Sequence, residues 1–204
     1  MLVRKNKHRR VLALLLLLLA LAGCNSGGLT VEQYLAWFGR KGCPLNKTQE
    51  VRGYKYELHY VTPDFMALKE IPREQLTRSL LRNDLKERDG LYYFLLRITP
   101  AAEKLSELKD RESAEISWFS FGSQQSTMMI AGRDTMACKM IQFEPSMGIL
   151  PYQSFSIGIA KPGDSPNPDK DLVVEFYDKV NTGEVIRFKY NEEDFKKIPQ
   201  YKLQ

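Results

Sequence analysis

Histidine and cysteine, from which many catalytic and metal sites are built, are scarce in this sequence. The chain has 2 histidines and 3 cysteines among 204 residues. His8 lies in a basic N-terminal segment, so a histidine-based catalytic triad would need His59 as its base. No nucleophile motif accompanies His59, and an alternating pattern places it on the polar face of a strand. We therefore expect a surface imidazole and predict no catalytic residue.

The sequence also lacks a metal or cofactor motif. A zinc site needs several ligands at workable spacing, and Cys43, Cys138 and a single histidine do not provide them. Asp164, Asp169 and Asp171 lack the ordered ligand pattern of a calcium loop, and two prolines stiffen the segment around them. No glycine motif for phosphate is present. We predict no metal and no cofactor.

The first 23 residues have the features of an export signal. Five basic residues and no acid occupy the first ten positions, and an apolar, leucine-rich run follows over residues 11–22. The run is about a dozen residues long, whereas a membrane-spanning helix needs roughly 20. A cleaved signal is therefore favoured over a short uncleaved membrane anchor.

The segment Leu21-Ala22-Gly23-Cys24 directly follows this run and resembles the lipobox of bacterial lipoproteins. The resemblance implies that the Cys24 thiol receives a diacylglyceryl group, that a peptidase cuts before Cys24, and that the new amino group is acylated, with chains such as palmitate. One acyl chain holds a protein only marginally, but two or three make a durable anchor. Asn25 and the neutral residues after it lack the sorting aspartate of Escherichia-type lipoproteins and the acidic surface-export signal of Bacteroidota. The resemblance thus implies the periplasmic face of the outer membrane.

Removal of the signal changes the charge of the chain. The signal carries five of the 30 Lys and Arg residues, which leaves 25 against 25 Asp and Glu. The apparent net charge of +5 therefore falls to zero over the remaining 181 residues. No strongly basic run survives, so we expect no nucleic-acid partner. The length suits one domain, with residues 24–29 as lipidated cysteine and tether and residues 30–204 as the domain.

Cys43 and Cys138 remain once Cys24 is lipidated. The periplasm is oxidising, so two thiols there form a disulfide if the geometry allows. The alternative is two separate buried thiols that act as small apolar residues. The sequence leaves both alternatives open.

The periodicity of apolar residues predicts a β-rich α+β fold. Helices are expected at residues 30–38, 64–70 and 73–88, with a last helical turn at 191–197, so that helices concentrate in the N-terminal third of the mature chain. Short strands with turn signals between them indicate an antiparallel sandwich or open barrel. The expected strands are residues 52–61, 91–99, 115–122, 125–131, 137–144, 154–160, 172–177 and 185–190. Most strand aromatics are expected in the core rather than in an interface.

The first expected helix lies almost at the lipid. Thr30 and Gln33 form a capping-box pattern, and Val31, Tyr34 and Phe38 share one face. The residues between Cys24 and this helix span at most about 17 Å when fully stretched. The helix is therefore expected to pack on the domain core, with a membrane-lying helix as the alternative.

Three segments resemble uncharacterised Bacteroidota envelope lipoproteins: LTVEQYLAWF, GYKYELHYV leading to PDFMALKE, and the ending GEVIRFKYNEEDFKKIP. Asp134-Thr135-Met136 resembles the triplet at which Bacteroidota attach O-linked glycans, which would make Thr135 the acceptor. The alternative for this triplet is an ordinary turn.

These features favour a membrane-anchored envelope lipoprotein that acts as a non-enzymatic accessory or binding subunit of a cell-envelope or secretion assembly. The alternative is a small envelope hydrolase or glycan-binding protein. A glycosidase needs two carboxylates at a set separation, and 25 acids scattered over the chain do not single out a pair.

Overall fold

One antiparallel sheet dominates the computed structural model, which describes residues 28–106, 116–144, 150–163, 165 and 167–203. Within these residues the sheet has eight strands in the order β1-β2-β3-β6-β5-β4-β7-β8. The strands are β1 (Asn46–Val51), β2 (Tyr54–Val61), β3 (Leu91–Pro100), β4 (Thr127–Ala131), β5 (Asp134–Glu144), β6 (Gln153–Ala160), β7 (Leu172–Asp178) and β8 (Glu184–Tyr190).

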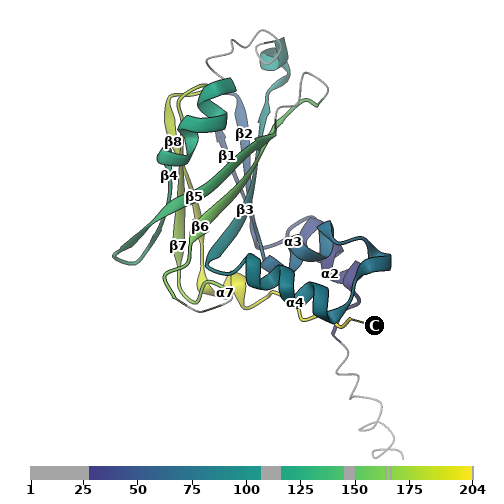
Figure 1. Ribbon diagram of the computed structural model, residues 1–204. Helices are drawn as coiled ribbons and strands as arrows, with labels where there is room; N and C mark the ends of the chain where they lie inside the picture. The colour runs from purple at the N-terminus through teal and green to yellow at the C-terminus, as the bar shows by residue number, and fades with distance from the viewer. Residues whose placement is uncertain (1–27, 107–115, 145–149, 164, 166, 204) are drawn as a thin grey trace, which may run out of the picture.

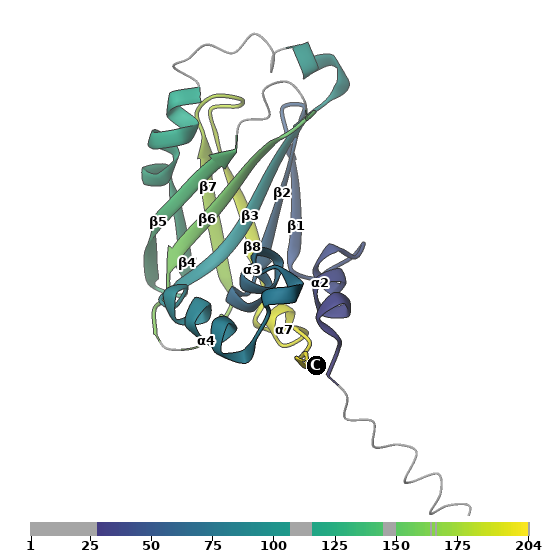
Figure 2. The same cartoon turned by 45° about the vertical axis from the view of Figure 1, so that its right-hand side comes forward.

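The sheet curls until its first and last strands lie side by side (Figures 1 and 2). No backbone ladder joins β1 to β8 in the described chain, and side chains bridge this seam instead. Arg52 pairs with Glu184 at one end of the seam, and Lys47 pairs with Asp194 at 2.8 Å near the other. The fold is therefore a nearly closed barrel, which selects the barrel from the two predicted architectures.

Alternating side chains fill the barrel interior with apolar and aromatic groups. On β2, Tyr54, Tyr56, Leu58 and Tyr60 are buried, whereas the residues between them are half-buried or exposed. Ring contacts then cross the interior, such as that between Tyr60 and Phe94 with centroids 5.4 Å apart. The expected core role is confirmed for most strand aromatics.

The helices lie mainly at one end and side of the barrel (Figure 2). They are α2 (Val31–Gly39), α3 (Pro63–Glu70), α4 (Arg78–Glu87) and the short α7 (Glu192–Phe195), with single turns η1 (Arg73–Gln75), η2 (Ala102–Lys104), η3 (Trp118–Gly122) and η4 (Ser123–Ser126). Thr30 caps α2 through the predicted capping box, and Val31, Tyr34 and Phe38 are buried. This helix packs on the core through these three side chains, as expected.

Three sequence-based assignments are corrected. Residues 115–122 are not a strand, and their described part is helical. Phe119 is buried while Phe121 is 79% exposed, whereas residues two apart on a strand would share one face. The expected helix over residues 73–88 is interrupted. A new helix, α4, begins at Arg78, and the Thr77 Oγ1 atom caps it by accepting a hydrogen bond from the Leu80 N–H. The strand β1 was not expected, because its residues are polar on both faces.

The carboxylate of Asp178 links β7 to β2 across the seam between β1 and β8. It is fully buried at the end of β7 and accepts a 2.6 Å hydrogen bond from the Tyr56 hydroxyl on β2. It also accepts bonds from the backbone N–H groups of Val180 and Asn181 and from the Asn181 side chain. Four donors therefore compensate the cost of burying this charge.

Replacing Tyr56→Phe removes one of these donors and leaves the ring in place. We expect a loss of about 1–3 kcal/mol in unfolding free energy, because a hydrogen bond to a buried charge is lost. Urea unfolding measures the change. Tyr92→Phe is the matched control, since its hydroxyl makes only a 3.5 Å contact with the carbonyl of Ser165. Equal destabilisation by both substitutions would contradict a special role for Asp178.

Candidate functional site

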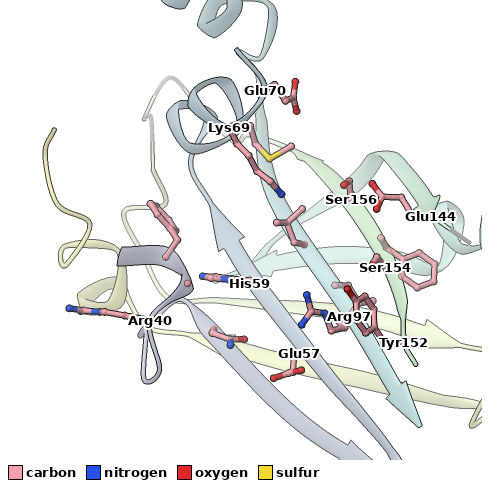
Figure 3. A pocket seen from close by; sticks show the side chains of 17 residues that line it. Arg40, Glu57, His59, Lys69, Glu70, Arg97, Glu144, Tyr152, Ser154 and Ser156 are labelled. Carbon is pink, nitrogen blue, oxygen red and sulfur yellow. The ribbon is translucent and has the colours of Figure 1, made fainter. Parts of the chain in front are cut away.

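A cavity of about 640 Å³ opens on the outer face of the sheet, between strands β2, β3 and β6 and the helices α2 and α3 (Figure 3). Side chains fill the barrel interior, so on this side of the molecule a ligand has room only outside the barrel. Its lining is mostly polar: Arg40, Asn46, Glu57, His59, Lys69, Glu70, Arg97, Glu144, Tyr152, Ser154 and Ser156.

Strand register places these side chains in two neighbouring rows across the sheet. One row crosses four neighbouring strands. In order, it holds Glu57 on β2, Arg97 on β3, Ser154 on β6 and Glu144 on β5. Positions two residues apart on a strand share a face, so the next row holds His59 and Ser156. The site is thus a patch of the sheet surface, with α2 and α3 along its side.

Two cations define the charge of the cavity. The Arg97 guanidinium lies over the Tyr152 ring, 4.2 Å from its centroid, and Lys69 extends from α3 towards the sheet (Figure 3). Neither forms an ion pair with any carboxylate of the described chain. By contrast, Glu57 is paired with Lys55 at 2.8 Å and Glu70 is paired with Arg88. The cavity therefore presents positive charge that a carboxylate or phosphate would neutralise.

Arg40 and Glu144 contribute less to the centre of the cavity. Arg40 stacks over the Trp37 ring at 4.7 Å, and both Arg40 and Glu70 point away from Lys69 and Arg97 in Figure 3. Glu144 is exposed at the far end of its row. A ligand that reaches Lys69 and Arg97 would also meet the hydroxyls of Ser154 and Ser156.

His59 is not the surface imidazole that the sequence predicts. It is half-buried beneath α2, with its ring centroid 6.1 Å from that of Phe38 and its Nε2 atom 3.7 Å from the sulfur of Cys43. The alternating pattern shows only which face of β2 carries His59. It does not show that α2, a separate element earlier in the chain, covers that face. Burial lowers the pKa of His59 to about 4, so the imidazole is neutral at neutral pH.

The Cys43–His59 contact lacks the properties of a nucleophilic pair. An active cysteine must be a thiolate that a substrate can reach. Cys43 is 3% exposed, and burial raises the pKa of its thiol while it lowers that of His59. Both shifts oppose a thiolate–imidazolium pair, so we assign this contact to packing.

The two cysteines for which the sequence leaves a disulfide open are free thiols in the structure. Cys43 contacts His59, whereas Cys138 on β5 donates to the backbone carbonyl of Met140 at 3.1 Å. Strands β3 and β6 separate β2 from β5 in the sheet, so the two thiols belong to different neighbourhoods. They match the alternative of two buried thiols.

The remaining sequence-based site residues lie away from the cavity. Thr135 is exposed at the start of β5, just after the Gly132-Arg133 turn of the β4–β5 hairpin, where a transferase could reach its hydroxyl. Cys24 lies outside the described residues. No described group of His, Cys, Asp and Glu side chains is arranged to hold a metal ion. Arg97 and Tyr152, which shape the cavity, were not singled out by the sequence.

Comparisons with protein-family models, with curated proteins and with solved structures found no match. Of the helices in the described ranges, none has the length and apolar character needed to cross a membrane.

The neutral His59 makes stability depend on pH. Its folded-state pKa of about 4 lies below the ordinary histidine value of 6.5, so the unfolded chain binds the proton more readily. Stability is therefore retained above pH ~6.5 and lost as the pH falls towards 4, by up to about 3 kcal/mol.

Urea unfolding of wild type and His59→Gln at a series of pH values isolates this contribution. Protonation of carboxylates whose pKa is lowered, such as Asp89 and Asp194, also destabilises the protein as the pH falls. The contribution of His59 is therefore the difference between the two proteins in how their unfolding free energy changes with pH. We expect the substituted protein to lose less stability between pH 6.5 and 4. Parallel curves would show that His59 titrates normally.

Proposed function

We propose that this protein is a non-enzymatic binding subunit of the bacterial cell envelope. Lipid on Cys24 holds it on the periplasmic face of the outer membrane, and the outer-face cavity receives an acidic segment of a protein partner. The observation that carries the proposal is the pair of cations, Lys69 and Arg97, which face a cavity of about 640 Å³ without a carboxylate partner in the described chain.

The chemistry of the cavity favours an acidic peptide. Arg97 stacks over the Tyr152 ring, and a guanidinium can bind a carboxylate through two parallel N–H donors. Ser154 and Ser156 add hydroxyl donors, and the neutral His59 adds no charge. Phe38 and Met66 supply an apolar wall beside these polar groups. A segment with carboxylates and an apolar side chain would match this combination.

A hydrolase or glycan-binding protein is the second candidate, because Glu57 and Glu144 line the same cavity. They are three strand spacings apart in one row, which is roughly 14 Å between backbones at ~4.8 Å per strand. A glycosidase pair needs carboxyl groups about 5–9.5 Å apart. Arg97 also lies between the two acids and covers one face of the Tyr152 ring, on which a sugar would stack. The arrangement therefore fits binding of a carboxylate better than sugar chemistry.

The anchoring part of the proposal is tested by Cys24→Ser. Loss of the thiol removes the site of lipid attachment, so we expect the substituted chain to leave the membrane fraction or to keep its signal. Membrane fractionation and intact-mass measurement of the protein from its native host decide between these results. A substituted chain that is cut and stays on the membrane like the wild type would refute lipid anchoring.

The binding part is tested by Lys69→Gln combined with Arg97→Gln. A photo-cross-linker at Ser154, on the cavity floor, should capture a partner in native membranes. An oligoglutamate peptide should compete with this capture, and an oligolysine peptide should not. Each charged hydrogen bond contributes about 1.5–3 kcal/mol, so loss of both cations should reduce capture by more than tenfold.

Lys139→Gln with Lys189→Gln is the matched control for this double variant. It removes the same charge from exposed positions that do not line the cavity. Capture should stay at the wild-type level in the control. If the cavity variant and the control capture the partner equally, or if oligoglutamate does not compete, the cavity is not the binding site.

A further inference from the structure

A second hollow, a groove of about 1050 Å³, runs between α4 and the C-terminal segment at the helical end of the barrel. Its floor and walls include Leu81 and Leu85 of α4, and Ile198, Tyr201 and Leu203 of the C-terminal segment. It is separate from the outer-face cavity and shares no lining residue with it.

One wall of the groove carries a row of positive charge. Arg78, Arg82 and Lys86 are spaced four residues apart on α4, so they form a stripe along one side of the helix. All three are exposed and line the groove, and none forms an ion pair in the described chain.

The carboxylates at the groove already have partners. Asp64 accepts a 2.6 Å hydrogen bond from the Tyr201 hydroxyl, and Asp89 pairs with Lys161 at 2.9 Å, which lowers the pKa of Asp89. Further along α4, Asp84 binds Arg88. The stripe therefore keeps an excess of positive charge over an apolar floor.

The groove lies where the lipid anchor would emerge. Leu29 forms a parallel bridge with Tyr201, with backbone hydrogen bonds of 2.9 Å to Gln200 and from Lys202. The segment that leads to Cys24 thus starts on the C-terminal wall of the groove. Five residue steps separate Leu29 from Cys24, which allows at most about 17 Å of reach.

We propose that this groove docks on the membrane surface by binding the phosphate headgroups of anionic phospholipids in the leaflet that carries the anchor. The inference rests on the proposed lipidation of Cys24, since the short tether is what places the groove at the bilayer. Cationic side chains bind headgroup phosphates, and this is the attraction that Arg78, Arg82 and Lys86 offer to an anionic surface.

Hydrogen exchange of the full lipidated protein tests this docking. The protein is reconstituted into vesicles of phosphatidylcholine alone, or of phosphatidylcholine mixed with phosphatidylglycerol. We expect slower exchange in α4 and in residues 198–203 on the anionic vesicles only, and loss of the difference in high salt. Arg82→Gln with Lys86→Gln should reduce this protection on the order of tenfold, given the usual attraction per cation.

Lys139→Gln with Lys189→Gln is again the control and should keep the wild-type protection. Equal exchange on the two kinds of vesicle, or equal protection in the groove variant, would overturn the proposal. Inorganic phosphate that reproduces the protection on phosphatidylcholine would assign the groove to a free anion instead. Protection that requires native membranes and is absent with phosphatidylglycerol would assign it to a protein, which also overturns lipid docking.

Co-flotation in the same samples separates this inference from the proposed anchoring. A lipidated protein floats with both kinds of vesicle whatever its groove does. Failure to float on phosphatidylcholine contradicts the anchor, whereas flotation without anionic protection contradicts the docking alone.

Discussion

The buried carboxylate of Asp178 is the constraint on which the shape of the barrel depends. Tyr56 belongs to the second strand of the sheet order and Asp178 to the seventh, so their hydrogen bond links the strands on either side of the β1–β8 seam. A second bond across this seam runs from the Tyr190 hydroxyl on β8 to the carbonyl of Leu58 on β2 at 2.8 Å. A buried charge that lost its donors would cost several kcal/mol, so these polar atoms help to hold the two ends of the sheet together. Aromatic rings then fill the remaining volume, and β1 meets β8 through ion pairs rather than a backbone ladder.

A filled interior moves the binding chemistry to the outside. In a barrel of eight strands the interior can be filled by side chains or can hold one small ligand. Here Tyr60, Phe94 and Tyr190 are buried in mutual contact inside it. Polar residues at alternate positions must therefore face outward, and the hollow beside α2 and α3 gathers those of β2, β3 and β6, such as Glu57, Arg97 and Ser154. The same alternation that builds the core thus builds the candidate site.

The sequence predicted those elements whose residues carry a local signal. Strands such as β2 and β7 alternate between buried and half-buried or exposed residues, and their positions were predicted within two residues. The strand β1 lacks this signal, because it lies at the edge of the sheet and has polar residues on both faces. Residues 118–122 carry aromatic side chains that suggest a strand, yet helical geometry buries Phe119 and exposes Phe121.

The candidate site could not be predicted for a different reason. Arg97 and Ser154 become neighbours only because β6 pairs with β3 across an intervening stretch of the chain.

Under the proposed lipidation of Cys24, the two hollows have complementary consequences for the orientation of the domain. A single point of attachment would leave the domain free to tilt, so the outer-face cavity would sample many directions. A second contact at the groove, on the wall where the chain leaves for Cys24, would remove most of this freedom. The outer-face cavity does not share lining residues with the groove, so it would remain open while the groove is occupied. A fixed orientation would keep the cavity directed at a partner in the same membrane and so raise its effective concentration there. This would offset the weak affinity expected of a polar site.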